Sequence, residues 1–133
     1  MRQWLFGSLL AIYLASFSIS SQAHSTAVSS VVGDKQVGVA SYYSDKFHGR
    51  RTANGERYDR DGLTAMHPRL PFGTLIKVTN LRNQRSVYLR VNDRTRLRGR
   101  RLLDVSKRAA QVLGFVGAGM AQVEIEVLRF GDS

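Results

Sequence analysis

The fold is decided by two neighbouring segments, TLIKVTN at residues 74–80 and SVYLRVN at residues 86–92. In the first, Ile76 and Val78 lie on the opposite face from Leu75 and Lys77. In the second, apolar and polar residues alternate at every position. A period of two predicts strands with one buried face each. Residues 80–84 are rich in turn-forming types, so the pair predicts a hairpin.

Further strands are predicted on both sides of this hairpin. Apolar, β-branched and aromatic residues predict strands at 37–43, 63–66 and 102–105. Strict alternation predicts the last strand at 121–128, with inward-facing Val123, Ile125 and Val127. Short strands with one apolar face each favour a mainly β fold, a small closed barrel, because closure removes exposed strand edges. The pattern alone leaves the strand order open.

One short helix is predicted at residues 107–113. Ser106 is a favourable N-cap, most of the following residues are good helix formers, and Gly114 stands where a helix C-terminus favours glycine. The apolar stripe of this helix is predicted to comprise Val105, Ala109, Val112 and Leu113.

The N-terminus has the layout of a secretory signal peptide, with Arg2 before an apolar run of 16 residues and a small-x-small ending at Ala23. A membrane span needs about 20 residues, although an uncleaved anchor is the alternative. We therefore divide the chain into a signal peptide at 1–23, a flexible lead-in at 24–36 and a barrel domain at 37–129. We expect a periplasmic or secreted monomer.

The chain contains no cysteine, which excludes disulfides, thiolate metal sites and a cysteine nucleophile. It also excludes attachment of a lipid to an N-terminal cysteine, so we expect no membrane anchor after signal cleavage. Neither a cofactor nor a metal is predicted, because the acidic residues and histidines have no recognisable metal-ligand spacing.

The chain is strongly basic, with a net charge of +10, and loss of Arg2 with the leader leaves +9. Arginines crowd residues 82–108, which favours an anionic partner. Nucleic acid is not expected, because the leader directs export and the aromatic residues do not interleave with the arginines as a stacking platform would. An anionic polymer of the cell envelope fits better, and a solvated basic face without a partner remains the alternative.

Residues 44–62 form a long polar stretch without a helical stripe, and loops of this length are usually functional. Glu56 and Asp59 lie in it, His67 follows the next strand, and Asp93 ends the hairpin. Asp93 could be a general acid for glycoside cleavage or a structural hydrogen-bond acceptor. A second carboxylate could raise the pKa of Asp93, and Arg94 would oppose it.

The other acidic residues and the histidine also have structural alternatives. Glu56 and Asp59 could bind a metal, accept hydrogen bonds from sugar hydroxyls, or do neither. His67 precedes a proline and could equally be a packed side chain. Asp104 is interpreted as structural, accepting backbone hydrogen bonds near the helix start.

Several separate motifs resemble, in order, the RlpA-like family (rare lipoprotein A, septal ring lytic transglycosylases), whose barrel is related to that of expansins. They are GVASYY at 38–43, FHGRRTANGERYD at 47–59, LTAMH at 63–67, LPFGT at 70–74, VTNL at 78–81, VNDR at 91–94 and DVS at 104–106. The resemblance spans nearly the whole chain after the leader.

This resemblance implies a six-stranded double-psi β-barrel that cleaves peptidoglycan. The implied reaction is a lyase reaction, endolytic and non-hydrolytic, at the MurNAc–GlcNAc β-1,4 linkage, and it leaves a 1,6-anhydro end. By similarity Asp93 is the acid and then the base, while Glu56, Asp59 and His67 bind and polarise the sugar.

The supporting hydrogen-bonders implied by the resemblance are Thr52, Asn54 and Asn92. The alternative function is a glycan-binding or wall-loosening module without turnover, as in expansins. The chain departs from the family where Thr95 and Arg96 replace a common Gly-Pro pair, which adds charge beside Asp93.

Overall fold

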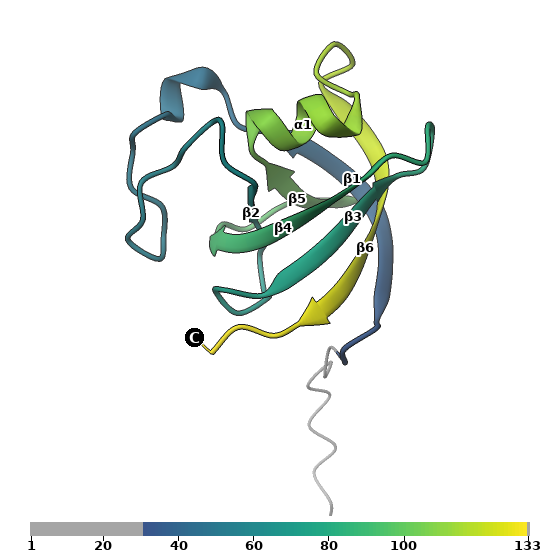
Figure 1. Cartoon of the computed structure of the whole chain (residues 1–133), viewed down its shortest axis with the longest axis horizontal. Helices are drawn as coiled ribbons and strands as arrows, with labels where there is room; N and C mark the ends of the chain where they lie inside the picture. The colour runs from purple at the N-terminus through teal and green to yellow at the C-terminus, as the bar shows by residue number, and fades with distance from the viewer. Residues whose placement is uncertain (1–30, 133) are drawn as a thin grey trace, which may run out of the picture.

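The computed structural model describes residues 31–132, so the predicted signal peptide and residues 24–30 lie outside the described residues. A six-stranded barrel carries one α-helix and one short 3-10 helix (Figure 1). The elements are β1 (Lys35–Tyr42), η1 (Asp45–Phe47), β2 (Thr64–Met66), β3 (Leu75–Asn80), β4 (Ser86–Asp93), β5 (Arg101–Val105), α1 (Lys107–Leu113) and β6 (Met120–Arg129).

The strands close in the order β1-β5-β2-β4-β3-β6. Two of the pairings, β1 with β5 and β2 with β4, are parallel, and the other pairings are antiparallel. The predicted hairpin is formed by β3 and β4, where Ile76 pairs with Leu89 and Val78 with Val87. The predicted six-stranded double-psi β-barrel with one short helix is therefore confirmed.

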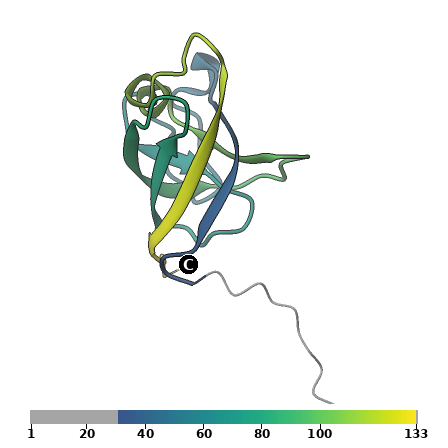
Figure 2. The same cartoon turned by 90° about the vertical axis from the view of Figure 1, so that its right-hand side faces the viewer.

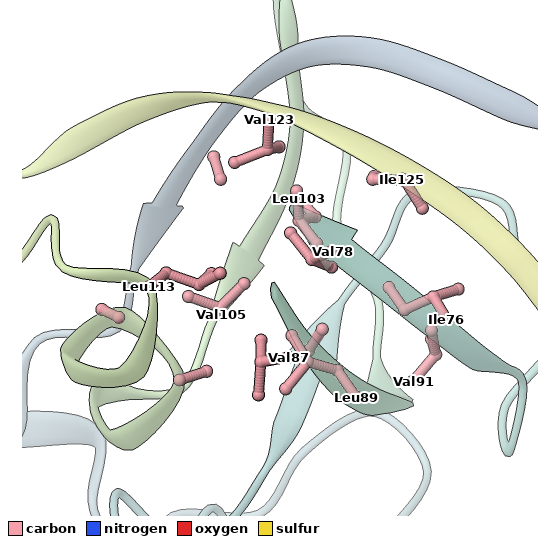
Figure 3. Close-up of a cluster of buried hydrophobic side chains, with 14 of the residues drawn as sticks. Ile76, Val78, Val87, Leu89, Val91, Leu103, Val105, Leu113, Val123 and Ile125 are labelled. Carbon is pink, nitrogen blue, oxygen red and sulfur yellow. The ribbon is translucent and has the colours of Figure 1, made fainter. Parts of the chain in front are cut away.

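The core is built from the apolar faces that the alternation predicts. Ile76 and Val78 of β3 are fully buried, and so are Leu89 and Val91 of β4. Figure 3 shows these side chains meeting inside the barrel with residues of β5, β6 and α1. Burial of these residues removes the apolar surface from water and supplies the main driving force for closing the barrel.

Helix α1 begins and ends where predicted, and its buried face includes one residue that the predicted stripe lacks. Ser106 Oγ accepts from Ala109 N at 3.2 Å, and Gly114 has φ 76°, in the left-handed region. Ala110 is fully buried, whereas Val112 is only partly buried. The buried positions 106, 109, 110 and 113 follow helical spacing and form the face of α1 that packs on the barrel. Val112 lies at the edge of this face.

The strand ends differ slightly from the predicted ones. β1 starts at Lys35, inside the predicted lead-in, because Lys35 pairs with Glu126 of β6. The segment 43–63 connects β1 to β2 and extends beyond one end of the barrel, at the left of Figure 1. Within residues 31–132, no helix is long and apolar enough to cross a membrane.

Candidate active site

A cleft of about 540 Å³ lies beside the carboxyl ends of β1, β2 and β4. The long connection 43–63 covers one side of it, and the start of the β4–β5 connection covers another. Its polar lining includes Ser41, Tyr43, Ser44, Arg50, Arg51, Asp93, Arg94, Thr95, Arg101 and Asp104.

Asp93, the predicted acid, is partly buried in this cleft, and three donors fix its carboxyl group. Its Oδ1 accepts from Ala53 N and from Arg94 N, both at 2.8 Å. Its Oδ2 accepts from the Tyr43 hydroxyl at 2.5 Å. These donors come from three different segments of the chain, so the carboxyl orientation depends on the whole end of the barrel.

Arg94 contacts Asp93 through its backbone, while its guanidinium has other partners. Arg94 Nη2 donates to Leu70 O at 2.5 Å, and the guanidinium lies 4.5 Å from the centre of the Phe72 ring. The arginine that the sequence places next to the candidate acid therefore directs its charged group to the segment 70–72.

Tyr43 is a site residue that the sequence analysis missed. Its ring packs 4.3 Å from that of Tyr58 and 6.1 Å from that of Phe47, centre to centre. Burial, followed by the hydrogen bond to Asp93, raises the pKa of Tyr43 above its ordinary value. Tyr43 therefore remains a neutral hydrogen-bond donor. Its position in the GVASYY motif was the available signal, but its aromatic character was interpreted only as a strand feature.

The cleft contains a second carboxyl group, that of Asp104 on β5. Its Oδ1 accepts from Arg101 Nη2 at 2.5 Å and also from the hydroxyl of Ser41. The prediction that Asp104 accepts hydrogen bonds from the backbone near the helix start is wrong for these contacts. β5 directs Asp104 towards β1, where its partners are side chains. Asp104 therefore lines the same cleft as Asp93.

Glu56 lies in an adjoining hollow and is held by Arg90 of β4. Arg90 Nη1 and Nη2 donate to its two oxygens at 2.7 and 2.8 Å, and Asn92 Nδ2 donates at 3.1 Å. The hydrogen bonds from Arg90, more than the opposing effect of burial, lower the pKa of Glu56 to about 2. Glu56 is therefore a carboxylate at neutral pH.

The predicted supporting residues hold the loop that carries Glu56. Thr52 Oγ1 donates to Asn54 Oδ1 at 2.6 Å, and the same oxygen accepts from Glu56 N at 3.0 Å. Asn54 N donates to Asn92 O at 3.4 Å, which joins this loop to β4. Thr52, Asn54 and Asn92 thus fix the segment whose Ala53 N–H reaches Asp93.

His67 is buried, and its side chain belongs to a different cavity of about 310 Å³, lined also by Gln36 and Arg69. Its Nδ1 accepts from Arg69 N at 3.1 Å and Leu70 N at 3.0 Å, which assigns the ring proton to Nε2. Burial, and then the charges of Arg69 and Arg94, lower the pKa of His67 to about 4. His67 contacts Asp93 through its backbone, N to O, at 3.2 Å.

Asp59 lies on an exposed turn, where its Oδ1 accepts from Asp61 N at 2.9 Å. The four predicted site residues therefore do not share one pocket. Asp93 lies in the cleft, Glu56 in the adjoining hollow, His67 in the separate cavity and Asp59 on the outer turn.

Among residues 31–132, no group of three or more His, Asp or Glu side chains could hold a metal ion.

Residues 35–125 match a family model described as lytic transglycolase. An endolytic peptidoglycan transglycosylase RlpA of Neisseria meningitidis serogroup A is 52% identical over 98 residues, which cover 74% of this chain and 41% of the relative. The RlpA of Campylobacter jejuni is 47% identical over 102 residues, covering 77% of this chain and 37% of the relative. The chain thus spans less than half the length of these curated relatives.

Two solved structures share the barrel fold at low sequence identity. The apo expansin of Clavibacter michiganensis has a TM-score of 0.58 and 21% identity, covering 75% of this chain and 53% of the expansin. The Streptomyces papain inhibitor has a TM-score of 0.57 and 21% identity, covering 74% of this chain and 97% of the inhibitor. The family match over residues 35–125 and the relatives at about half identity establish that the chain belongs to the RlpA-like family of lytic transglycolases.

Proposed function

We propose that this barrel is an endolytic peptidoglycan transglycosylase, which cleaves the MurNAc–GlcNAc β-1,4 linkage without water and leaves a 1,6-anhydro end. The relatives at about half identity are named endolytic peptidoglycan transglycosylases. The observation that carries the proposal is the carboxyl group of Asp93, which three donors hold at the wall of an open cleft.

One carboxyl group can perform both proton transfers of this reaction. In its protonated form Asp93 gives its proton to the glycosidic oxygen while the bond from that oxygen to C1 of MurNAc breaks. The C6 hydroxyl of the same sugar attacks C1, and its proton passes to Asp93. The acid is thereby regenerated, no water is consumed, and such proton transfer contributes about 10²–10⁴-fold in rate.

The neighbouring groups have states that suit binding better than proton donation. Glu56, with its pKa lowered to about 2, is charged at neutral pH and can accept hydrogen bonds from sugar hydroxyls. His67, with its pKa lowered to about 4, is neutral and holds the turn that follows it. The proton donor of the proposed reaction is therefore assigned to Asp93.

The proposed place of action is the cell envelope outside the cytoplasmic membrane, as a periplasmic or secreted protein. The leader-like pattern of residues 1–23 and the location of peptidoglycan support this assignment. The proposed partner is the glycan strand itself, and the proposed state is a monomer without a membrane anchor.

The test is mass spectrometry of the soluble products released from purified peptidoglycan, with Asp93→Asn in parallel. We expect anhydro-ended fragments from the wild type and none from the variant. Reducing-end fragments would instead indicate hydrolysis. If neither protein releases fragments while both bind the wall, the domain is a glycan-binding module of the expansin kind.

A further inference from the structure

The β4–β5 connection, residues 94–100, carries a set of arginines that the proposed reaction does not use. Figure 2 shows this connection projecting from the body of the barrel. Arg96, Arg98 and Arg100 are exposed, while Leu97 between them is partly buried. Within residues 31–132 none of the three arginines has an ion pair. We call residues 94–100 the arginine arm.

The base of the arginine arm is anchored to the barrel. Arg100 O accepts from Val39 N of β1 at 2.8 Å, and Arg98 O accepts from Arg101 N at 3.4 Å. Gly38 leaves room for Leu102 at this point, since a Cβ there would lie 2.5 Å from Leu102 Cγ. The barrel therefore holds the base of the arm beside the cleft.

The positive charge of the arginine arm continues into the cleft. Four arginines line the cleft together with two aspartates, and one of these arginines, Arg101, directly follows the arm. Arg101 already binds Asp104 at 2.5 Å, whereas Arg96, Arg98 and Arg100 of the arm leave their guanidinium groups open to a ligand. A polymer that lies in the cleft and continues along the arm therefore meets a row of cations.

We propose that the arginine arm binds carboxylate groups carried by the glycan strand outside the reacting disaccharide. This inference rests on the proposed function, because the chemistry of the ligand follows from the strand that occupies the cleft. A guanidinium group matches a carboxylate through two parallel hydrogen bonds, which favours this pairing over a simple attraction of charges. The carboxylates can be those of stem peptides or those of the lactyl groups exposed when peptides are removed.

The test measures binding of the purified chain to insoluble peptidoglycan by co-sedimentation at low salt. The arm variant combines Arg96→Gln, Arg98→Gln and Arg100→Gln. The control variant combines Arg82→Gln, Arg85→Gln and Arg129→Gln, which removes the same charge from other exposed positions. Both variants are first shown to unfold in urea like the wild type.

We expect the arm variant to bind about ten-fold more weakly than the wild type, and the control to change by no more than about two-fold. Conversion of the wall carboxylates to neutral amides should weaken the wild type to the level of the arm variant. Equal weakening of both triple variants would overturn the proposal, since general attraction of a basic surface would then suffice. Binding that still depends on the arm after amidation would also overturn it and indicate phosphate groups.

Peptidoglycan stripped of stem peptides identifies the source of the carboxylates. Loss of the difference between wild type and arm variant on stripped material assigns the carboxylates to the peptides. A retained difference assigns them to the lactyl groups. Binding requires no turnover, so a wild type that binds through the arm but releases no anhydro fragments would refute the transglycosylase and leave the arm assignment standing.

Discussion

Replacement of Glu56 by glutamine should destabilise the barrel in a pH-dependent way. The carboxylate of Glu56 receives three side-chain hydrogen bonds, two from Arg90 and one from Asn92, and its pKa is lowered to about 2. An acid with a lowered pKa in the folded state stabilises the fold above its unfolded pKa, near 4.5. This contribution is lost as the pH falls from about 5 towards 2.

The size of the effect follows from the shift and from the exposure of the pair. A shift from 4.5 to about 2 would correspond to roughly 3 kcal/mol for a fully shielded group. The side chains of Arg90 and Glu56 are 44% and 42% exposed, however, so solvent screens the pair strongly. Exposed ion pairs contribute about 0.2–1 kcal/mol, and the two parallel hydrogen bonds place this one near the upper end, about 1 kcal/mol.

The assay is urea denaturation of wild type and Glu56→Gln at pH 7 and pH 3. We expect the variant to lose about 1 kcal/mol of unfolding free energy at pH 7 and less than half of that at pH 3. Glu124→Gln, which removes the looser pair with Lys35 at 3.7 Å, is the matched control and should change little. Equal losses for Glu56→Gln at both pH values would refute the conclusion that ionised Glu56, paired with Arg90, stabilises the folded state.

Three further changes test the site and the barrel. Tyr43→Phe keeps the ring but removes the donor that orients the Asp93 carboxyl group. Loss of one hydrogen bond, about 0.5–1.5 kcal/mol, should slow release of anhydro fragments by about two- to ten-fold, and an unchanged rate would remove Tyr43 from the site. Leu89→Ala opens a cavity in the closed core, where Leu89 is fully buried. It should lower the free energy of unfolding, measured by chemical denaturation, by about 2–5 kcal/mol. A loss below about 1 kcal/mol would mean that the core collapses around the gap. Gly38→Ala places a Cβ 2.7 Å from Arg100 O. It should lower the free energy of unfolding by about 1–3 kcal/mol, measured by thermal unfolding. An unchanged melting temperature would show that β1 and β5 separate there without cost.

Strands β3, β4 and β6 were predictable because local alternation governs each of them. The buried residues of β3, β4 and β6 are the ones that a period of two selects, and the caps of α1 depend on Ser106 and Gly114 alone. The face of α1 was less predictable, because Ala110 and Val112 are both apolar and only the packing of the helix on the barrel selects between them.

The pairings within the candidate site could not be predicted from the sequence. Glu56 and Arg90 are 34 residues apart, and Tyr43 and Asp93 are 50 apart. Such contacts depend on strand order and register, which a single sequence pattern leaves open. The family resemblance identified the candidate carboxylate residues. The positions of Tyr43 and Asp104 in the cleft follow only from the way β1, β4 and β5 come together.

The position of β6 in the barrel has a consequence for biosynthesis. β6 is the last strand along the chain, and it closes the barrel by pairing with both β1 and β3. A nascent chain that ends before Met120 leaves β1 and β3 with unpaired edges, so the barrel cannot close. The proposed active site would thus form only after β6 has left the ribosome.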